Sequence, residues 1–111
     1  MKTNQLTGAA LDWAVAKCEG ITVLPNMRSV CYVTLDKGET VLLCYSTDWS
    51  QGGPIIEREK TAIKENGYGH WFAKVGTGKW MRGPTPLIAA MRCYVASKLG
   101  DEVDVPKELT I

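Results

Sequence analysis

The sequence has little of what catalysis and metal binding need. It contains one histidine, and its four cysteines include no Cys-x-x-Cys pair. A single histidine with no matched nucleophile offers little for acid–base catalysis, and the scattered cysteines lack the spacing of zinc ligands. We therefore expect no enzyme, no metal site and no cofactor. Because each cysteine stands in an apolar pattern, we expect free, buried thiols at these positions: Cys18, Cys31, Cys44 and Cys93.

Long apolar runs and a charge excess are also missing. No apolar segment of about 7–15 residues follows Met1, which disfavours a secretory signal, and nothing approaches the ~20 apolar residues of a membrane span. Lys and Arg number 13 against 12 Asp and Glu, so the net charge of +1 predicts no general attraction to nucleic acid or to a membrane surface. We expect a cytoplasmic protein.

The 111 residues are ordinary in composition, with 45% hydrophobic and 23% charged side chains, and predict one domain over residues 1–111. The patterns predict helices over residues 7–19 and 87–99, the second with Thr85 as N-cap, Pro86 at its first position and Gly100 after its end. Hairpins are predicted from residues 30–35 with 40–45, and from 70–75 with 79–82, besides a short run at 21–24. We expect an α+β fold: an antiparallel sheet of about four or five strands with two main helices packed on it.

Tryptophan is the residue in excess, with four Trp to one Phe. Trp71 and Trp80 are expected in the core of the second hairpin. Trp13 lies on the helix face opposite the apolar stripe of Leu11 and Val15, so we expect it to meet a partner, with a homodimer as one candidate. Trp49 stands in a polar segment rich in turn formers.

That segment, Ser46–Pro54 (STDWSQGGP), is predicted to be a loop, followed by a short extended run at residues 54–58 and a solvated connection or weak helical turn at 57–65. Its side chains can stack and hydrogen-bond, and its glycines permit close approach. Two interpretations stay open: a recognition surface, or a Trp49 that plugs the edge of the core above a simple turn.

Charge is unevenly distributed along the chain. No acidic residue occurs from Asn66 to Gly100, whereas residues 101–111 carry four acids and one Lys. Lys79 and Arg82 precede the second helix, whose first backbone N–H groups and Thr85 are suited to an anion, with Trp80 or Trp71 available to stack. The alternative is a chance distribution, in which the acidic tail folds back and neutralises this stretch.

Three blocks of the sequence carry a family resemblance: Thr7–Glu19 (TGAALDWAVAKCE), Tyr45–Glu59 (YSTDWSQGGPIIERE) and Gly83–Val105 (GPTPLIAAMRCYVASKLGDEVDV). Together they resemble the NinX family of lambdoid and related enterobacterial phages. The positions most typical of that family include Trp49 and the run Gly83–Pro86. The resemblance implies a non-structural, non-essential phage accessory protein in the bacterial cytoplasm, with no enzymatic activity or cofactor to carry over.

We therefore expect a binding protein that holds a small anionic, nucleotide-like ligand between the Trp49 loop and the start of the second helix. In a phage, sequestering a host defence signal nucleotide is a sensible use. The expected ligand-binding residues are Thr47, Asp48, Trp49, Gln51, Gly52, Gly53, Lys79, Trp80, Arg82 and Thr85. One alternative is a protein-interaction module that grips a host or phage protein through the same surface. A third is nucleic-acid binding through residues 66–100, which the near-zero net charge disfavours.

Overall fold

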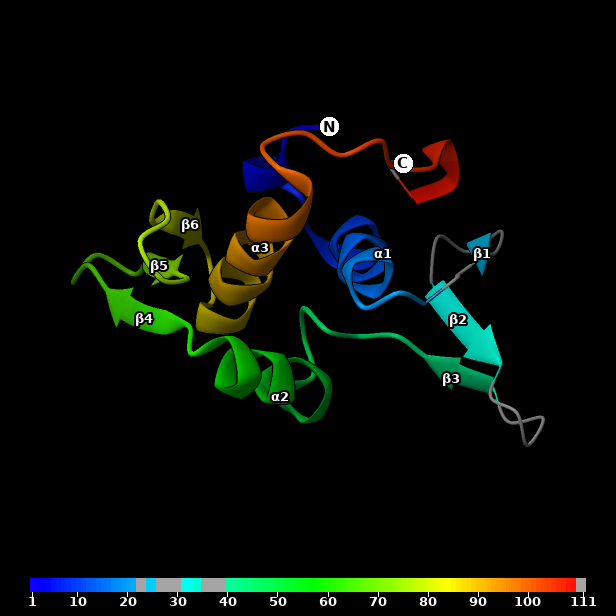
Figure 1. Ribbon diagram of the computed structural model, residues 1–111, viewed down its shortest axis with the longest axis horizontal. Coiled ribbons are helices and arrows are strands. Elements are labelled where there is room, and N and C mark those ends of the chain that lie inside the picture. Colours follow the sequence, from blue (N-terminus) through cyan, green and yellow to red (C-terminus); the bar gives the residue numbers. More distant parts are fainter. Residues whose placement is uncertain (22–23, 26–30, 35–39, 110–111) are drawn as a thin grey trace.

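A computed structural model of the chain describes residues 1–21, 24–25, 31–34 and 40–109. The molecule measures 42 × 28 × 23 Å, with two helices side by side in the middle and a small sheet at each end (Figure 1). Its elements, in chain order, are η1 (Thr3–Gln5), α1 (Gly8–Cys18), β1 (Leu24–Pro25), β2 (Cys31–Thr34), β3 (Thr40–Leu42), α2 (Trp49–Glu59), β4 (Ala62–Glu65), β5 (Trp71–Lys74), β6 (Met81–Gly83), α3 (Pro86–Leu99) and η2 (Lys107–Leu109).

Helix α3 is the centre of the fold and begins and ends as the sequence predicts. The Thr85 hydroxyl accepts a hydrogen bond from the Ile88 N–H at 3.1 Å, Pro86 opens the helix, and Gly100 follows it with a φ of +87°. The helix contacts η1, α1, α2 and all three strands β4–β6. It is therefore buried around most of its circumference, at Leu87, Ala89, Ala90, Met91, Arg92, Cys93, Tyr94 and Val95.

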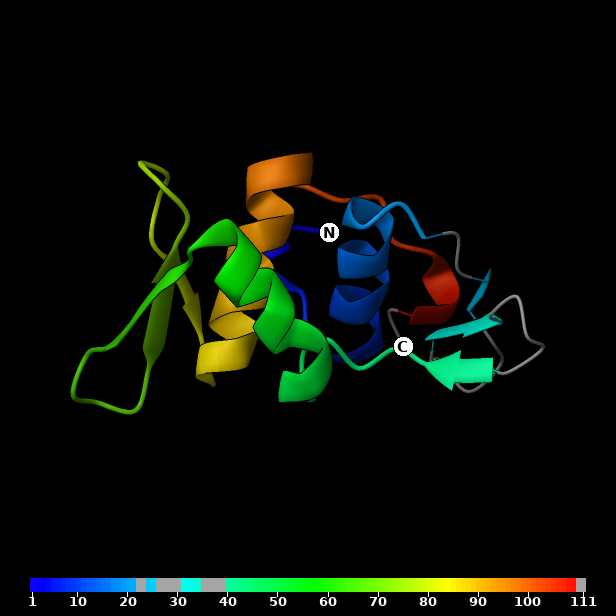
Figure 2. The ribbon, with the colours of Figure 1, turned by 60° about the horizontal axis from the view of Figure 1, so that its bottom comes forward.

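Both predicted hairpins are confirmed, but the single sheet of about four or five strands is wrong. Strands β1–β2–β3 and β4–β5–β6 form two separate antiparallel sheets of three strands each. They lie at opposite ends of the molecule because α1 and α3 stand between them (Figures 1 and 2). The turn at residues 36–39 and part of the run at 21–24 fall outside the described residues. Among those described, Cys18 and Cys44 are half-buried and Cys93 is buried, all as free thiols.

A third helix, α2, replaces the predicted loop and extended segment. The Asp48 carboxylate caps it by accepting from the Ser50 N–H at 2.9 Å, and Lys60 ends it with a φ of +54°. Two glycines and Pro54 weigh against a helix in isolation. Burial of one side against α3, including Ile55, stabilises it nevertheless, as tertiary packing commonly does.

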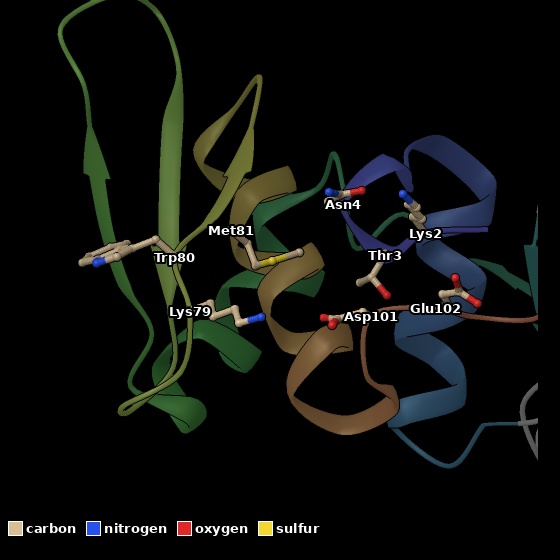
Figure 3. A pocket seen from close by; sticks show the side chains of 8 residues that line it. All are labelled: Lys2, Thr3, Asn4, Lys79, Trp80, Met81, Asp101 and Glu102. Carbon is tan, nitrogen blue, oxygen red and sulfur yellow. The ribbon is translucent and has the colours of Figure 1, made fainter.

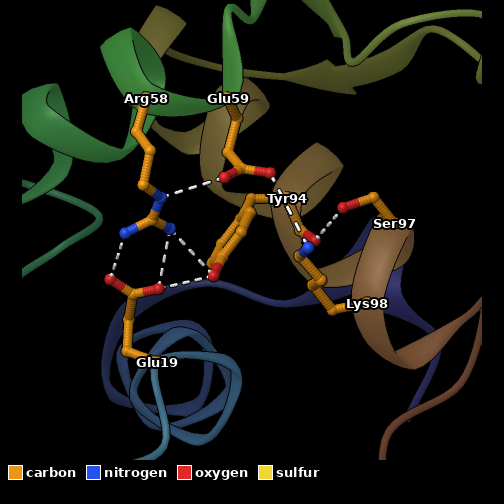
Figure 4. Close-up of polar contacts among 6 residues, drawn as sticks. All are labelled: Glu19, Arg58, Glu59, Tyr94, Ser97 and Lys98. Carbon is orange, nitrogen blue, oxygen red and sulfur yellow. Dashed lines mark hydrogen bonds and ion pairs between the residues drawn. The ribbon is translucent and has the colours of Figure 1, made fainter.

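The three helices are joined by a polar cluster around Arg58 (Figure 4). Arg58 donates two hydrogen bonds to the Glu19 carboxylate, at 2.8 and 3.0 Å, and one to the Tyr94 hydroxyl at 3.0 Å. Tyr94, which is almost fully buried on α3, in turn donates to Glu19. The hydrogen bonds from Arg58, more than any other contact, hold the pKa of Glu19 below its ordinary value.

We expect Glu19→Gln to lower the free energy of unfolding by about 1–2 kcal/mol at neutral pH, because it removes a two-pronged charge-assisted contact. A folded-state pKa below the unfolded value means that this contribution is present above pH 4.5, the ordinary value, and is lost as the pH falls through the folded-state pKa. Urea unfolding from pH 7 to pH 3 should show the two proteins converging. The exposed Glu57→Gln on α2 is the control and should give a small difference throughout. A Glu19→Gln difference that does not change with pH would contradict the assignment.

Candidate functional site

The polar side chains next to Trp49, Asp48 and Gln51, form hydrogen bonds within the chain itself. Asp48 accepts from both the N–H and the hydroxyl of Ser50, at 2.9 and 2.7 Å, and these contacts lower the pKa of its carboxyl. Gln51 accepts from the Cys44 N–H at 2.7 Å and donates to the Leu42 carbonyl at 3.1 Å. Asp48 therefore starts α2, and Gln51 ties that helix to the chain leaving β3.

The two neighbouring glycines differ in their surroundings. A Cβ on Gly52 would lie 2.6 Å from the Leu87 side chain and 2.6 Å from the Tyr45 carbonyl oxygen, whereas a Cβ on Gly53 would meet nothing closer than Trp49 at 3.9 Å. Gly52 is thus the point of close contact between α2 and α3. Its need for glycine is explained by packing within the chain.

Trp49 itself is 53% exposed. Together with Thr47 and Thr85 it borders a hollow of about 210 Å³, whose other lining residues are Ser46, Leu87 and Ile88. The structure therefore brings the Trp49 segment and the start of α3 together, as predicted from the sequence. No charged side chain from the ranges that the structure describes lines this Trp49 hollow, and the Thr85 hydroxyl already accepts the capping hydrogen bond.

Lys79 and Trp80 do not join that hollow, and they point in opposite directions (Figure 3). Lys79 points toward Asp101 and borders a hollow of about 460 Å³ that Lys2 and Glu102 also line. Asp101 and Glu102, the first two residues of the acidic tail, therefore lie beside Lys79, whereas η2 near the end of the tail lies on the far side of α1 (Figure 1). Trp80 points away from α3 and is 39% exposed, so its predicted place in a hairpin core is wrong, whereas Trp71 is half-buried against the core.

Arg82 lies apart from Trp49 and Lys79, beside His70 and Arg92, which were not among the residues predicted to bind a ligand. One Arg82 nitrogen, Nη2, lies 3.0 and 3.1 Å from the two ring nitrogens of His70. Both side chains border a hollow of about 390 Å³, and Arg92 reaches it from α3. We call this the arginine hollow; its lining residues are Asn4, His70, Arg82, Gly83, Pro84 and Arg92.

Arg92 is the unusual residue of this hollow, because it is a cation only 9% exposed. Its Nε donates to the Leu6 carbonyl at 2.7 Å and its Nη1 to the Arg82 carbonyl at 2.9 Å. Within the described part of the chain, Nη2 makes no hydrogen bond and no carboxylate forms an ion pair with Arg92. Burial lowers the pKa of the guanidinium, which nevertheless stays charged at neutral pH.

Among the described residues, the lining of the hollow therefore has two guanidinium groups and no acidic side chain. A buried charge that lacks a counter-ion is destabilising, and an anion in this hollow would reduce that penalty. Planar guanidinium groups match phosphate and carboxylate oxygens in geometry. One signal in the sequence could have identified Arg92: it interrupts an otherwise apolar run, Leu87–Val95, where a charged side chain needs buried partners.

Trp13, predicted as an interface residue, is half-buried and packs against the core, with the Lys17 ammonium 5.2 Å from the centre of its ring. Its position is explained within one chain, and the homodimer stays a prediction. Across residues 1–21, 24–25, 31–34 and 40–109, no three His, Cys, Asp or Glu side chains gather as a metal site. Nor does any helix in those ranges have the length and hydropathy to cross a bilayer.

Gly52 and Gly53 together give a direct test of how α2 packs against α3. We expect Gly52→Ala to destabilise the protein by about 1–3 kcal/mol, because the methyl group collides with a backbone carbonyl that cannot move aside cheaply. Gly53→Ala, one residue along the same helix, should be neutral or stabilising by up to about 1 kcal/mol. Thermal unfolding of both variants makes the comparison, and equal effects would rule out the packing explanation.

Comparison with known proteins gives one family. The family model described as "Bacteriophage P22, NinX" matches residues 2–98, and this range includes the arginine hollow and the Trp49 hollow. Among functionally curated proteins, no sequence matches the chain. The match covers most of the chain and agrees with the resemblance of its three sequence blocks, so this protein belongs to the NinX family of bacteriophage proteins.

Proposed function

We propose that this phage protein binds a small anionic ligand of nucleotide type and that it is not an enzyme. The arginine hollow carries the proposal, because it presents the buried Arg92 and the exposed Arg82, and no acidic residue of the described part of the chain lines it. The ligand site therefore differs from the one expected between Trp49 and the start of α3. Of the expected residues, Arg82 alone borders this hollow.

The chemistry of the lining fits a phosphate or pyrophosphate group. Arg82 offers a forked donor at the surface, and Arg92, whose Nη2 makes no hydrogen bond to the described residues, borders the same hollow from α3. His70, already in contact with Arg82, and the Asn4 amide complete the set of polar side chains. Because Arg92 is fixed by two carbonyls, it is ordered before any ligand arrives, which lowers the entropic penalty of binding.

The phage setting supplies the biological part of the proposal. A non-enzymatic protein that binds nucleotides in the cytoplasm of an infected cell can sequester a host defence signal. This step rests on the phage setting that the family indicates, and not on particular residues. It predicts that binding, without turnover, is the whole activity.

Calorimetric titration with pyrophosphate, ATP and adenosine at low salt tests the proposal. Pyrophosphate and ATP should bind and adenosine should not, and Arg82→Gln should weaken binding about tenfold or more, since hydrogen bonds to charged groups contribute about 1.5–3 kcal/mol. Lys17→Gln, on α1, removes the same charge away from the hollow and should bind like the natural protein. Unchanged affinity in Arg82→Gln, or no binding of either anion, would exclude this function.

A second candidate function, protein binding, is favoured by the exposed ring of Trp49 and by the apolar side chains of Leu87 and Ile88 beside it in the hollow. Affinity purification from infected cells tests it. A bacterial or phage protein that is retained by the natural protein and by Arg82→Gln, but lost in Trp49→Ala, would support this second candidate. Loss in Arg82→Gln instead would place the contact at the arginine hollow.

A further inference from the structure

The sheet β4–β5–β6 has two faces of opposite character. Side chains alternate between the faces of a strand, and Ala73, which is fully buried, together with Met81 and Ile63 forms the face that packs on α3. The residues between them project outward. Lys64, Phe72 and Arg82 form one row across the three strands, since Lys64 pairs with Phe72 and Phe72 with Arg82.

A second row of outward side chains includes Lys74, two residues after Phe72 in β5. The Lys74 ammonium lies 5.1 Å from the centre of the Trp80 ring. The ammonium of Lys64 lies 4.2 Å from the same ring. Trp80 also shares a hollow of about 320 Å³ with Phe72 and Lys64. We call this surface the Trp80 face; it consists of Lys64, Phe72, Lys74, Trp80 and Arg82.

None of the described helices covers the Trp80 face. Helices α1, α2 and α3 lie on the other side of the sheet (Figures 1 and 2), and Trp80 points away from α3 in Figure 3. Two aromatic rings and three cations thus share one side of the sheet, where the partly exposed Trp80 ring lies against the ammonium groups of Lys64 and Lys74.

We propose that the Trp80 face binds single-stranded nucleic acid, with bases stacked on Trp80 and Phe72 and phosphates held by Lys64, Lys74 and Arg82. Aromatic rings interleaved with cations on an open sheet are what single strands require, because every base has a face that can stack and every linkage carries a charge. The proposal rests on the proposed anion site in one respect: Arg82 belongs to both surfaces.

The dimensions of the face suit a short stretch of polynucleotide. Neighbouring strands lie about 4.8 Å apart, so three strands span about 10 Å, and the two rows are separated by about 7 Å. That area accommodates two or three stacked bases, the number that exposed aromatics on a comparable sheet hold. A base on Trp80 displaces one of the two ammonium groups from the ring, and the released ammonium stays within reach of the adjoining phosphate.

Lys64, Lys74 and Arg82 give the Trp80 face a local positive charge that the net charge of +1 does not describe. Asp101 and Glu102 border a hollow that both Lys79 and Trp80 line, but the Lys79 side chain points toward Asp101, whereas Trp80 points away from α3. One carboxylate, that of Glu65, borders the hollow of Trp80 and Phe72, and it accepts a hydrogen bond from the Gly67 N–H at 3.1 Å. It stands at the end of β4, opposite Trp71.

Fluorescence anisotropy with labelled eight-nucleotide RNA, the matching DNA and a blunt DNA duplex tests the proposal. At low salt, at least one single strand should bind and the duplex should bind at least tenfold more weakly; the RNA and DNA arms identify the preferred strand. Trp80→Ala should weaken binding about 5- to 100-fold, as loss of one stacked base does, while Trp80→Phe should restore most of it. Trp49→Ala, an exposed tryptophan on α2, is the matched control and should bind normally.

The salt dependence adds a second readout. Replacing Lys64 and Lys74 by Gln should reduce the slope of log affinity against log salt by about 1.4, that is about 0.7 for each phosphate contact. Equal affinities of Trp80→Ala and Trp49→Ala, or equal binding of the duplex, would overturn the proposal. Pyrophosphate binding separates the two ideas: if it persists and depends on Arg82 while no oligonucleotide binds, the anion site stands and this inference fails. If neither binds, both fail.

Discussion

Arg92 projects from the middle of α3 and donates hydrogen bonds to carbonyls from two other parts of the chain, Leu6 ahead of α1 and Arg82 in β6. Those bonds fix the N-terminal segment and the last strand of the β4–β6 sheet to the one helix that most elements contact. They satisfy two guanidinium nitrogens but not the charge, because a carbonyl is only a dipole. Arg92 therefore stabilises the fold through these hydrogen bonds, and its charge makes the potential positive in the neighbouring hollow.

Charge is distributed unevenly over the surface of the protein. A net charge of +1 describes the chain as a whole, but the tail residues Asp101 and Glu102 lie with Lys2 and Lys79. Arg82, His70 and Arg92 share a hollow that no acidic side chain of the described residues lines, and Lys64 and Lys74 lie near Trp80. Local fields, rather than net charge, determine which anions a surface attracts.

Local signals predict much of the fold. The caps of α3 can be predicted from Thr85, Pro86 and Gly100, and the strands of both hairpins from apolar runs that flank turn-forming residues. The two hairpins belong to separate sheets because α1 and α3 lie between them. Local sequence patterns could not predict this separation, since it depends on the packing of elements that are distant in the chain. The glycines and the proline of α2 prevented its prediction from the sequence, and the helix forms because Gly52 and Ile55 pack inward.

The sequence predicts one anion site that includes Lys79, Trp80 and Arg82, because the three residues are close neighbours in the chain, but the structure separates Lys79 from the other two. That these residues bind an anion stays a prediction. Strand geometry separates such neighbours, since adjacent side chains point to opposite faces. Thus Lys79 meets the tail while Trp80 and Arg82 face outward, and Arg92, ten residues further on, returns to Arg82 through the packing of α3.

The most direct test is ¹H–¹⁵N NMR of the arginine Nε–H groups during titration with pyrophosphate. We expect the signals of Arg82 and Arg92 to move together with one dissociation constant, because both side chains border the hollow that the anion enters. The signal of Arg58, which is held by Glu19 on another side of α3, should not move. Stationary signals from Arg82 and Arg92, or a shift of Arg58 alone, would contradict the assignment of the arginine hollow as the anion site.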